Sequence, residues 1–241
     1  MRRLSPHMVR VTFASEELAA FAWSGPASHI KLIFDAGALP AAEGARAPMR
    51  TYTPRTFDRE ACELDVDFVI HGEGPASAWA AQAAVGQMLT IAGPGRSYSI
   101  DPAADWYVLV GDDTAIPAIG TILESLSPSM HVRALIEVVD AAEQHALEGR
   151  GLRGARADIG WLARGPDPRN AGRELEAAVQ RLELPPGSGR IYVACEADAM
   201  RRIRRHLLQE RQFPREHLVT RGYWRLGETD HPDRDYGEDA G

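Results

Sequence analysis

Cysteine is scarce in this sequence, and its scarcity removes several classes of protein. Only Cys62 and Cys195 occur among the 241 residues, which excludes a disulfide framework and a cysteine-ligated iron–sulfur cluster. The eight histidines show no His-x-x-x-His or similar spacing, so we expect no protein-bound metal. No Gly-x-Ser-x-Gly segment is present, and this absence argues against a serine hydrolase.

Long apolar runs and excess positive charge are also missing. No run reaches the about 18 apolar residues that a membrane-spanning helix needs, and Ser5-Pro6-His7 interrupts any apolar signal-peptide region. The formal net charge of −7 argues against general nucleic-acid binding. We therefore expect a cytoplasmic protein without a membrane span or a nucleic-acid partner, either a monomer or a weak dimer.

Short segments with strand character fill the first hundred residues. Alternation of apolar and polar residues, the mark of a half-buried strand, or a short apolar run is found at 8–13, 29–34, 50–56, 64–70, 88–92 and 97–100. One short helix is expected from Pro75 to about Ala84. Many short strands with turn signals indicate an antiparallel β-barrel, which we assign to residues 1–101.

The pattern changes after Asp101-Pro102. Nearly continuous apolar runs, typical of buried parallel strands, alternate with segments of helical spacing. The expected strands are 106–110, 132–139, 157–162, 191–195 and 217–220. This alternation predicts a doubly wound parallel sheet in residues 102–241, with a ligand cleft where it meets the barrel. The acidic tail from Glu228 lacks apolar residues, and we expect it to be loose.

Two segments of the barrel could bind a dinucleotide. Side chains alternate along a strand, so in residues 50–55 Arg50 and Tyr52 share one face. Residues 69–77 form a strand that runs through Gly-x-Gly-Pro-Ala into a helix, whose N-terminus suits a phosphate. An arginine, a stacking aromatic and a phosphate site favour a flavin cofactor. A barrel with a solvated arginine and a Gly-Pro turn fits these residues equally well.

The second domain offers three further motifs. Residues 111–117 join the first parallel strand to its helix, where a nucleotide pyrophosphate normally lies; the alternative is a capping turn with Thr114 as N-cap. Cys195 ends a later strand and either faces a nicotinamide or is a small buried hydrophobe. The aromatic pair Tyr223-Trp224 either belongs to the core or covers a flat ring.

Taken together, these segments resemble the siderophore-interacting protein family, FAD-dependent ferric-siderophore reductases within the wider ferredoxin-NADP reductase-like flavoproteins. Residues 5–11 and 29–32 are similar to the family's first two strands. The motifs Arg-x-Tyr-Thr, His-Gly-x-Gly-Pro-Ala-x-x-Trp, Gly-Pro-x-x-Ser, Gly-Asp-[Asp/Glu]-Thr-Ala-x-Pro and Gly-Tyr-Trp match residues 50–53, 71–79, 93–97, 111–117 and 222–224. Each match is weak alone, but seven in the right order are specific and cover almost the whole chain.

The resemblance implies an FAD site in the barrel. Arg50 would pair with the pyrophosphate, Tyr52 would lie against the isoalloxazine, and Thr53 would bond near its N5. His71 and residues 74–77 would cradle the phosphates. The complete set expected to bind FAD is Arg50, Thr51, Tyr52, Thr53, Asp67, Val69, His71, Gly72, Gly74, Pro75, Ala76, Ser77, Trp79, Thr114, Tyr223 and Trp224.

The resemblance also implies a site for NADH or NADPH in the second domain. The residues expected there are Gly111, Asp112, Asp113, Thr114, Ala115, Pro117, Cys195 and Glu196. Cys195 departs from the glycine common in this family, although a cysteine is usual in the wider reductases. No basic pocket for a 2′-phosphate distinguishes NADPH from NADH.

The implied reaction is reduction of a ferric siderophore. FAD would take a hydride from NAD(P)H and pass electrons singly to the chelate. Hard oxygen chelators hold Fe(III) more tightly than Fe(II), so reduction would release the iron without a metal ligand from the protein. Many ferric siderophores are anionic, and Lys31, Arg55 and Arg96 are the cations that we expect to bind them. Ordinary surface charge explains each of these three cations equally well.

Two other functions fit the same residues. A general NAD(P)H:flavin or ferredoxin-type reductase would reduce dyes and soluble iron without preferring particular chelates. A non-catalytic siderophore carrier would bind ferric chelates without a flavin. The Arg-x-Tyr-Thr segment at 50–53 argues against the carrier, which has no use for a flavin site.

Overall fold

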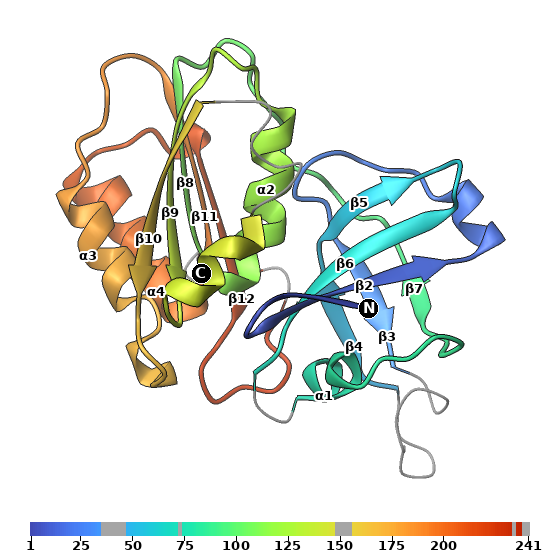
Figure 1. Cartoon of the computed structure of the whole chain (residues 1–241). Coiled ribbons are helices and arrows are strands. Elements are labelled where there is room, and N and C mark those ends of the chain that lie inside the picture. Colours follow the sequence, from blue (N-terminus) through green and yellow to red (C-terminus); the bar gives the residue numbers. More distant parts are fainter. Residues whose placement is uncertain (35–46, 72–73, 148–155, 233–234, 238–241) are drawn as a thin grey trace. The chain divides into compact units, whose positions relative to one another are not determined.

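Short antiparallel strands make up the first part of the chain, and parallel strands with helices make up the second (Figure 1). The computed structural model describes residues 1–34, 47–71, 74–147, 156–232 and 235–237. It divides into two units, Met1–Ser99 and Ile100–Gly241. Each unit is described by itself below.

The first unit contains two antiparallel sheets. The four-stranded sheet has the order β1 (Arg2–Ser5), β2 (Met8–Ala14), β6 (Glu63–Val69) and β5 (Pro54–Asp58). The three-stranded sheet has the order β4 (Met49–Tyr52), β3 (Ile30–Ile33) and β7 (Thr90–Ala92). A short 3-10 helix, η1 (Glu16–Ala20), and the helix α1 (Pro75–Ala81) complete the unit. The expected antiparallel architecture is confirmed.

Two details of the first unit differ from the sequence prediction. The strand predicted over 50–56 is divided at Thr53, and its halves β4 and β5 belong to different sheets. Pro54 has no N–H to donate, and the pairing of β5 with β6 is irregular between Pro54 and Thr56. Residues 97–100 form no strand; the backbone N–H of Tyr98 instead donates to the carbonyl of Pro26 at 2.8 Å.

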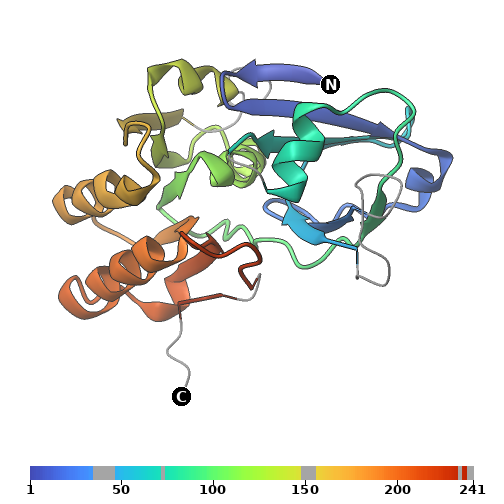
Figure 2. The same cartoon turned by 90° about the horizontal axis from the view of Figure 1, so that it is seen from below.

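An aromatic cluster fills the core of the first unit. The ring centroid of Trp79, on α1, lies 6.0 Å from that of Phe13 and 5.8 Å from those of Phe34 and Phe68. Trp79 is 2% exposed. This packing holds α1 against β6 and β2 of the four-stranded sheet (Figure 2).

The second unit is a five-stranded parallel sheet, as predicted. Its order is β10 (Arg156–Ala163), β9 (His131–Val138), β8 (Trp106–Asp112), β11 (Gly189–Glu196) and β12 (Leu218–Trp224). Helix α2 (Ile116–Ser125) covers one face, and α3 (Arg173–Arg181) with α4 (Ala197–Arg205) covers the other (Figure 1). The chain order reverses between β8 and β11, which makes their carboxyl ends the switch point where such sheets bind ligands.

Smaller helical segments connect these elements. They are the 3-10 helices η2 (Asp113–Ala115), η3 (Ala141–Leu147), η5 (Pro168–Asn170) and η7 (Arg215–His217) and the π-helix η6 (His206–Glu210). Among them η2 matters most for the site, because it starts directly at the end of β8.

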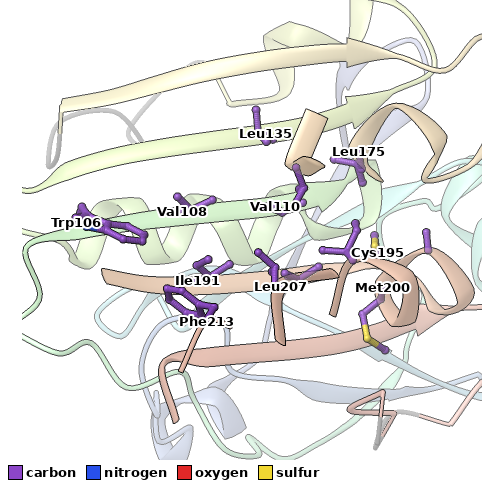
Figure 3. Packing of buried hydrophobic residues seen from close by; sticks show 14 residues of the cluster. Trp106, Val108, Val110, Leu135, Leu175, Ile191, Cys195, Met200, Leu207 and Phe213 are labelled. Atoms are coloured by element: carbon purple, nitrogen blue, oxygen red, sulfur yellow. The ribbon is translucent and has the colours of Figure 1, made fainter. Parts of the chain in front are cut away.

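The core under α3 and α4 is a hydrophobic cluster of side chains from β8, β11 and the two helices (Figure 3). Trp106 and Phe213 lie at one end, with ring centroids 6.1 Å apart. Cys195 lies at the other end near Met200. Every residue of β8 is buried, in agreement with the nearly continuous apolar run in its sequence.

The C-terminal segment differs from the expectation of a loose tail. The backbone N–H of Gly222 donates to the carbonyl of Asp235 at 2.8 Å, and the Thr220 hydroxyl donates to the carbonyl of Tyr236 at 2.5 Å. Arg201 on α4 forms an ion pair with the Asp235 carboxylate at 2.6 Å. Residues 235–237 therefore lie along β12, held by backbone and ionic contacts that hydrophobic content does not reveal.

Candidate functional site

The strand β4 places its side chains on two distinct faces. Tyr52 is paired with Ile30, and Arg50 with Leu32; both partners are completely buried. Directly opposed residues share a face, so Arg50 and Tyr52 lie on the same side of the sheet, as their spacing predicts. Thr51 lies on the other side, where its hydroxyl accepts a hydrogen bond from Lys31 Nζ at 2.6 Å.

Tyr52 presents a neutral, partly exposed ring. Its centroid lies 4.5 Å from that of Phe68, and the side chain is half-buried. Burial raises the pKa of its hydroxyl above the ordinary value, although the nearby Arg50 opposes this effect. A neutral phenol beside a guanidinium can stack on a flat ring and donate a hydrogen bond. Thr53, which follows at the break between β4 and β5, is 8% exposed.

The start of α1 is open enough for a ligand to approach. A Cβ added at Gly74 would meet no atom of the described residues within 4 Å. Pro75 is the first helical residue, and the amides of Ala76 and Ser77 have no acceptor within the helix. This open position, at a helix start whose first amides have no acceptor within the helix, fits an approaching phosphate. Gly72, which we also assigned to FAD, lies outside the described residues.

Several residues assigned to FAD are bound to the protein itself. The Ser77 hydroxyl accepts from the backbone N–H of His71 at 2.9 Å. Both oxygens of Asp67 accept from the Arg10 guanidinium, at 2.6 and 2.8 Å. Val69 is half-buried at the end of β6. Trp79 lies in the aromatic core, where its indole Nε1 has no partner among the described residues.

The three cations assigned to the substrate differ in exposure. Arg96 is exposed and Lys31 is half-buried, whereas Arg55 is only 6% exposed. Lys31 and Arg96 are therefore accessible in the first unit, and Arg55 is not. Gly95, the residue before Arg96, packs closely on His29, since a Cβ added to this glycine would lie 2.1 Å from His29 Nε2.

Asp112 joins three segments at the carboxyl edge of the parallel sheet. Its Oδ1 accepts from the backbone N and the hydroxyl of Thr114, at 3.0 and 2.5 Å. Its Oδ2 accepts from the backbone N of Glu196 at 2.9 Å and from Trp224 Nε1 at 2.8 Å. The ends of β8, β11 and β12 therefore meet at one carboxylate.

Burial dominates the ionisation of this carboxylate. Loss of solvation and the neighbouring Asp113 raise the pKa of Asp112 from 3.8 to about 7, against the hydrogen bonds from Thr114 and Trp224 and the charge of Arg164. Asp113 itself forms an ion pair with Arg164 Nη2 at 2.6 Å. Neither carboxylate faces solvent, since Asp112 is 1% and Asp113 4% exposed.

The other residues assigned to the nicotinamide nucleotide are packed inside the unit. A Cβ added at Gly111 would lie 2.6 Å from Ala115 Cβ and 2.9 Å from the carbonyl of Ala194. Pro117 is buried at the start of α2. Thr114 is half-buried and is thus more exposed than these neighbours.

Cys195 and Glu196 also have internal roles in the structure. Cys195 is completely buried, and burial raises the pKa of its thiol well above the ordinary value. It points into the core against α4 (Figure 3), which agrees with the apolar interpretation that its sequence left open. Glu196 Oε2 accepts from the backbone N of Ala199 at 2.9 Å and so caps α4.

Two charged residues of this edge, the buried Glu137 and the half-buried Arg164, were missed from the sequence. Glu137, the residue before the end of β9, accepts from the backbone N of Gly172 at 2.8 Å, at the start of α3. Arg164 follows β10 and pairs with Asp113. The rule that ligands gather at the carboxyl ends of parallel strands would have selected both positions.

The aromatic pair that ends β12, Tyr223 and Trp224, is half-buried. The hydroxyls of Tyr223 and Tyr192 lie 2.9 Å apart, and the Trp224 indole is bound to Asp112.

No helix within the described residues is long and apolar enough to cross a membrane. The same residues contain no cluster of three or more histidine, cysteine or acidic side chains that could hold a metal ion.

Comparison with known proteins gives a consistent result along the chain. Residues 1–98 match the model of the siderophore-interacting FAD-binding domain, and residues 104–227 match that of the siderophore-interacting protein. The crystal structure of a siderophore utilization protein from T. fusca is 36% identical, with a TM-score of 0.81, and the match covers 98% of this chain and 93% of that one.

Two curated bacterial relatives have names that state an activity. Ferric vibriobactin reductase ViuB of Vibrio cholerae is 33% identical, over 94% of this chain and 87% of its own length. The NADPH-dependent ferric-chelate reductase of Escherichia coli is 31% identical, over 93% and 89% respectively. The likeness therefore extends over nearly the full length of each partner, and the chain belongs to the siderophore-interacting protein family.

Proposed function

We propose that this chain reduces ferric siderophores with NADPH or NADH, using FAD as its cofactor. The observation that carries the proposal is the arrangement in the first unit, where Arg50 and Tyr52 share one face of β4 and Gly74 leaves the start of α1 open. The FAD-binding family match over residues 1–98 supports it. The named activities of the two bacterial relatives agree with it.

Four groups of the first unit would hold FAD. The Arg50 guanidinium suits the pyrophosphate, because a planar fork of N–H donors pairs with phosphate oxygens. The neutral ring of Tyr52 would lie on the isoalloxazine, with Thr53 beside it, and the amides after Gly74 would receive phosphate oxygens. When bound, FAD supplies hydride acceptance and single-electron donation.

The carboxyl edge of the parallel sheet would receive the nicotinamide nucleotide. Thr114 and Trp224 are the half-buried side chains at this switch point, and open α/β sheets bind ligands there. The buried residues Gly111, Ala115 and Cys195 would shape the edge from within.

We assign residues 1–101 to the flavin and residues 102–241 to the nucleotide. We place the reaction in the cytoplasm, where the reduced nucleotides are found.

Lys31 and Arg96 would attract the anionic chelate. Both are accessible in the first unit, and cations near a binding site raise the local concentration of an anionic substrate. Arg55, being buried, would support β5 more than it would touch a chelate. Because hard oxygen ligands bind Fe(III) more tightly than Fe(II), reduction releases the iron to an acceptor.

A substitution of Lys31 tests the substrate side of this proposal. We expect Lys31→Ala to raise the KM for an anionic ferric siderophore by about threefold to tenfold, the effect of one partly screened charge, with kcat nearly unchanged. The rate is measured with NADPH and an Fe(II)-specific trapping chelator. Arg2→Ala, an exposed cation on β1, is the matched control, and equal KM values for both variants would remove Lys31 from the substrate site.

A further inference from the structure

Asp112 is saturated with hydrogen bonds from the protein. Four donors point at its two oxygens, from Thr114, Glu196 and Trp224, and a carboxylate has about four lone-pair positions. The residue is 1% exposed. A nucleotide hydroxyl therefore finds neither a free lone pair nor a path to this side chain.

We propose that Asp112 is a positioning residue that orients the Trp224 indole and the Thr114 hydroxyl toward the nicotinamide nucleotide without touching it. The proposal rests on the proposed reductase function. It changes two expectations from the sequence, in which Asp112 was a nucleotide ligand and Trp224 an FAD ligand. Trp224 and Thr114 are half-buried, so each presents a second side to a ligand while its polar hydrogen stays on Asp112.

The hydrogen bonds decide what each side chain can offer. The Thr114 hydroxyl donates its only hydrogen to Asp112 at 2.5 Å, which leaves oxygen lone pairs as acceptors for a ligand N–H or O–H. The Trp224 indole donates its only N–H at 2.8 Å, which leaves its flat ring for stacking. Because Asp112 holds both polar hydrogens, the Thr114 hydroxyl offers a ligand only an acceptor, and the Trp224 indole offers it only a stacking surface.

The neighbouring carboxylates have different tasks. Asp113 is paired with Arg164, Glu137 accepts from the start of α3, and Glu196 caps α4. Each of these bonds supports a helix or an ion pair. Only Asp112, among the acidic residues of the described carboxyl edge, also binds side chains at the carboxyl ends of both β8 and β12.

The first arm of the test observes the Trp224 indole directly. In a ¹⁵N-labelled sample of the full chain, the Trp224 resonance is the indole signal that disappears in Trp224→Phe. We expect Asp112→Asn to shift it upfield and to speed its hydrogen exchange about tenfold, the effect of losing one charge-assisted hydrogen bond. An unmoved resonance in a folded Asp112→Asn protein would overturn the proposal.

Two further variants keep this arm decisive. Thr114→Val removes a competing donor but keeps Asp112, so the Trp224 resonance should move downfield, opposite to the shift in Asp112→Asn. It therefore remains a test if Asp112→Asn fails to fold, and no shift in Thr114→Val would contradict the proposal. Asp158→Asn, an exposed carboxylate paired with Arg133, is the charge-matched control and should leave the resonance unchanged.

The second arm measures NADPH-dependent chelate reduction by the FAD-loaded protein. Asp112→Asn and Trp224→Phe should each lower kcat/KM about tenfold. The double variant should be no less active than the less active of the two single variants, because both substitutions remove the same interaction. Independent effects that multiply in the double variant would show that Asp112 acts separately from Trp224, and would overturn the positioning role. If the wild type reduces no chelate, the proposed function fails, and the indole measurement still decides whether Asp112 holds the Trp224 indole.

Discussion

Buried carboxylates at the sheet edge act on the protein itself and not on a ligand. Glu137 is completely buried, and its oxygens accept from the backbone N of Gly172 at 2.8 Å and of Leu175 at 3.4 Å. Gly172 has no side chain with which to cap α3, so Glu137 supplies the missing acceptor from a neighbouring strand. The acidity of this edge is therefore structural.

We expect Glu137→Ala to destabilise the protein by about 2 kcal/mol or more, because a buried amide at the start of α3 loses its acceptor and a cavity forms. The free energy of unfolding is measured by urea titration. Glu60→Ala, an exposed residue, should change it by less than about 0.5 kcal/mol. Equal stability of the two variants would mean that α3 is capped in another way.

The raised pKa of Asp112 predicts a pH-dependent stability. Burial and the charge of Asp113 raise it from 3.8 to about 7, and Thr114, Trp224 and Arg164 oppose the rise. A carboxyl group with a raised folded-state pKa stabilises the fold below its unfolded pKa, and this stabilisation is lost as the pH rises through the folded value. The window is therefore pH 4 to about 7.

Unfolding free energies of wild type and Asp112→Asn between pH 4 and 8 test this linkage. The amide does not titrate, so the stability of wild type relative to the variant should fall as the pH rises through this window. A constant difference would show that the four hydrogen bonds cancel the effect of burial.

Two glycines meet opposite surroundings. Gly111 is the residue before the end of β8, where an added Cβ would lie 2.6 Å from Ala115 Cβ and 2.9 Å from the carbonyl of Ala194. Neither atom is the end of a flexible side chain, so η2 or β11 must shift. We expect Gly111→Ala to lower the unfolding free energy by about 1–3 kcal/mol, the usual cost of overpacking, in a thermal or urea titration.

Gly74 is the matched counterpart at the start of α1. Its φ of −61° suits any residue, and an added Cβ meets no described atom within 4 Å. Gly74→Ala should therefore leave stability almost unchanged but weaken FAD binding, about tenfold, if phosphates approach the helix there. Fluorescence titration of the apoprotein with FAD measures the Kd, and an unaltered Kd would move the phosphates away from α1.

The sequence pattern was sufficient to predict strands in which every residue, or every second residue, is buried. Alternation over 64–70 gave β6, and the apolar runs gave β8 and β11, because burial of one or both faces dictates those patterns. The division at Thr53 was not visible, since a strand that changes sheets keeps its alternation. The same limit applies to Cys195, whose direction depends on packing against α4.

The meeting of Thr114, Glu196 and Trp224 at Asp112 could not be predicted in detail. It requires the strand order, which brings residues more than a hundred positions apart to one edge. The sequence nevertheless placed all four in candidate motifs, because carboxyl ends of parallel strands attract polar residues. The docked residues 235–237 were missed because hydrogen bonds and ion pairs leave no apolar pattern.

The two units together define the protein as a member of the siderophore-interacting family. The first unit offers the features that a flavin needs, and the second offers the switch point that a nicotinamide nucleotide needs. We propose that electrons pass from the nucleotide to the flavin and then to the ferric chelate.

An anaerobic absorbance spectrum of the purified, FAD-loaded protein tests this claim most directly. We expect the visible flavin bands to bleach on addition of NADPH or NADH and to return on addition of a ferric siderophore, with one equivalent of Fe(II) trapped per electron. Absence of flavin bands after addition of FAD, or bands that bleach but do not return with the ferric siderophore, would contradict the account.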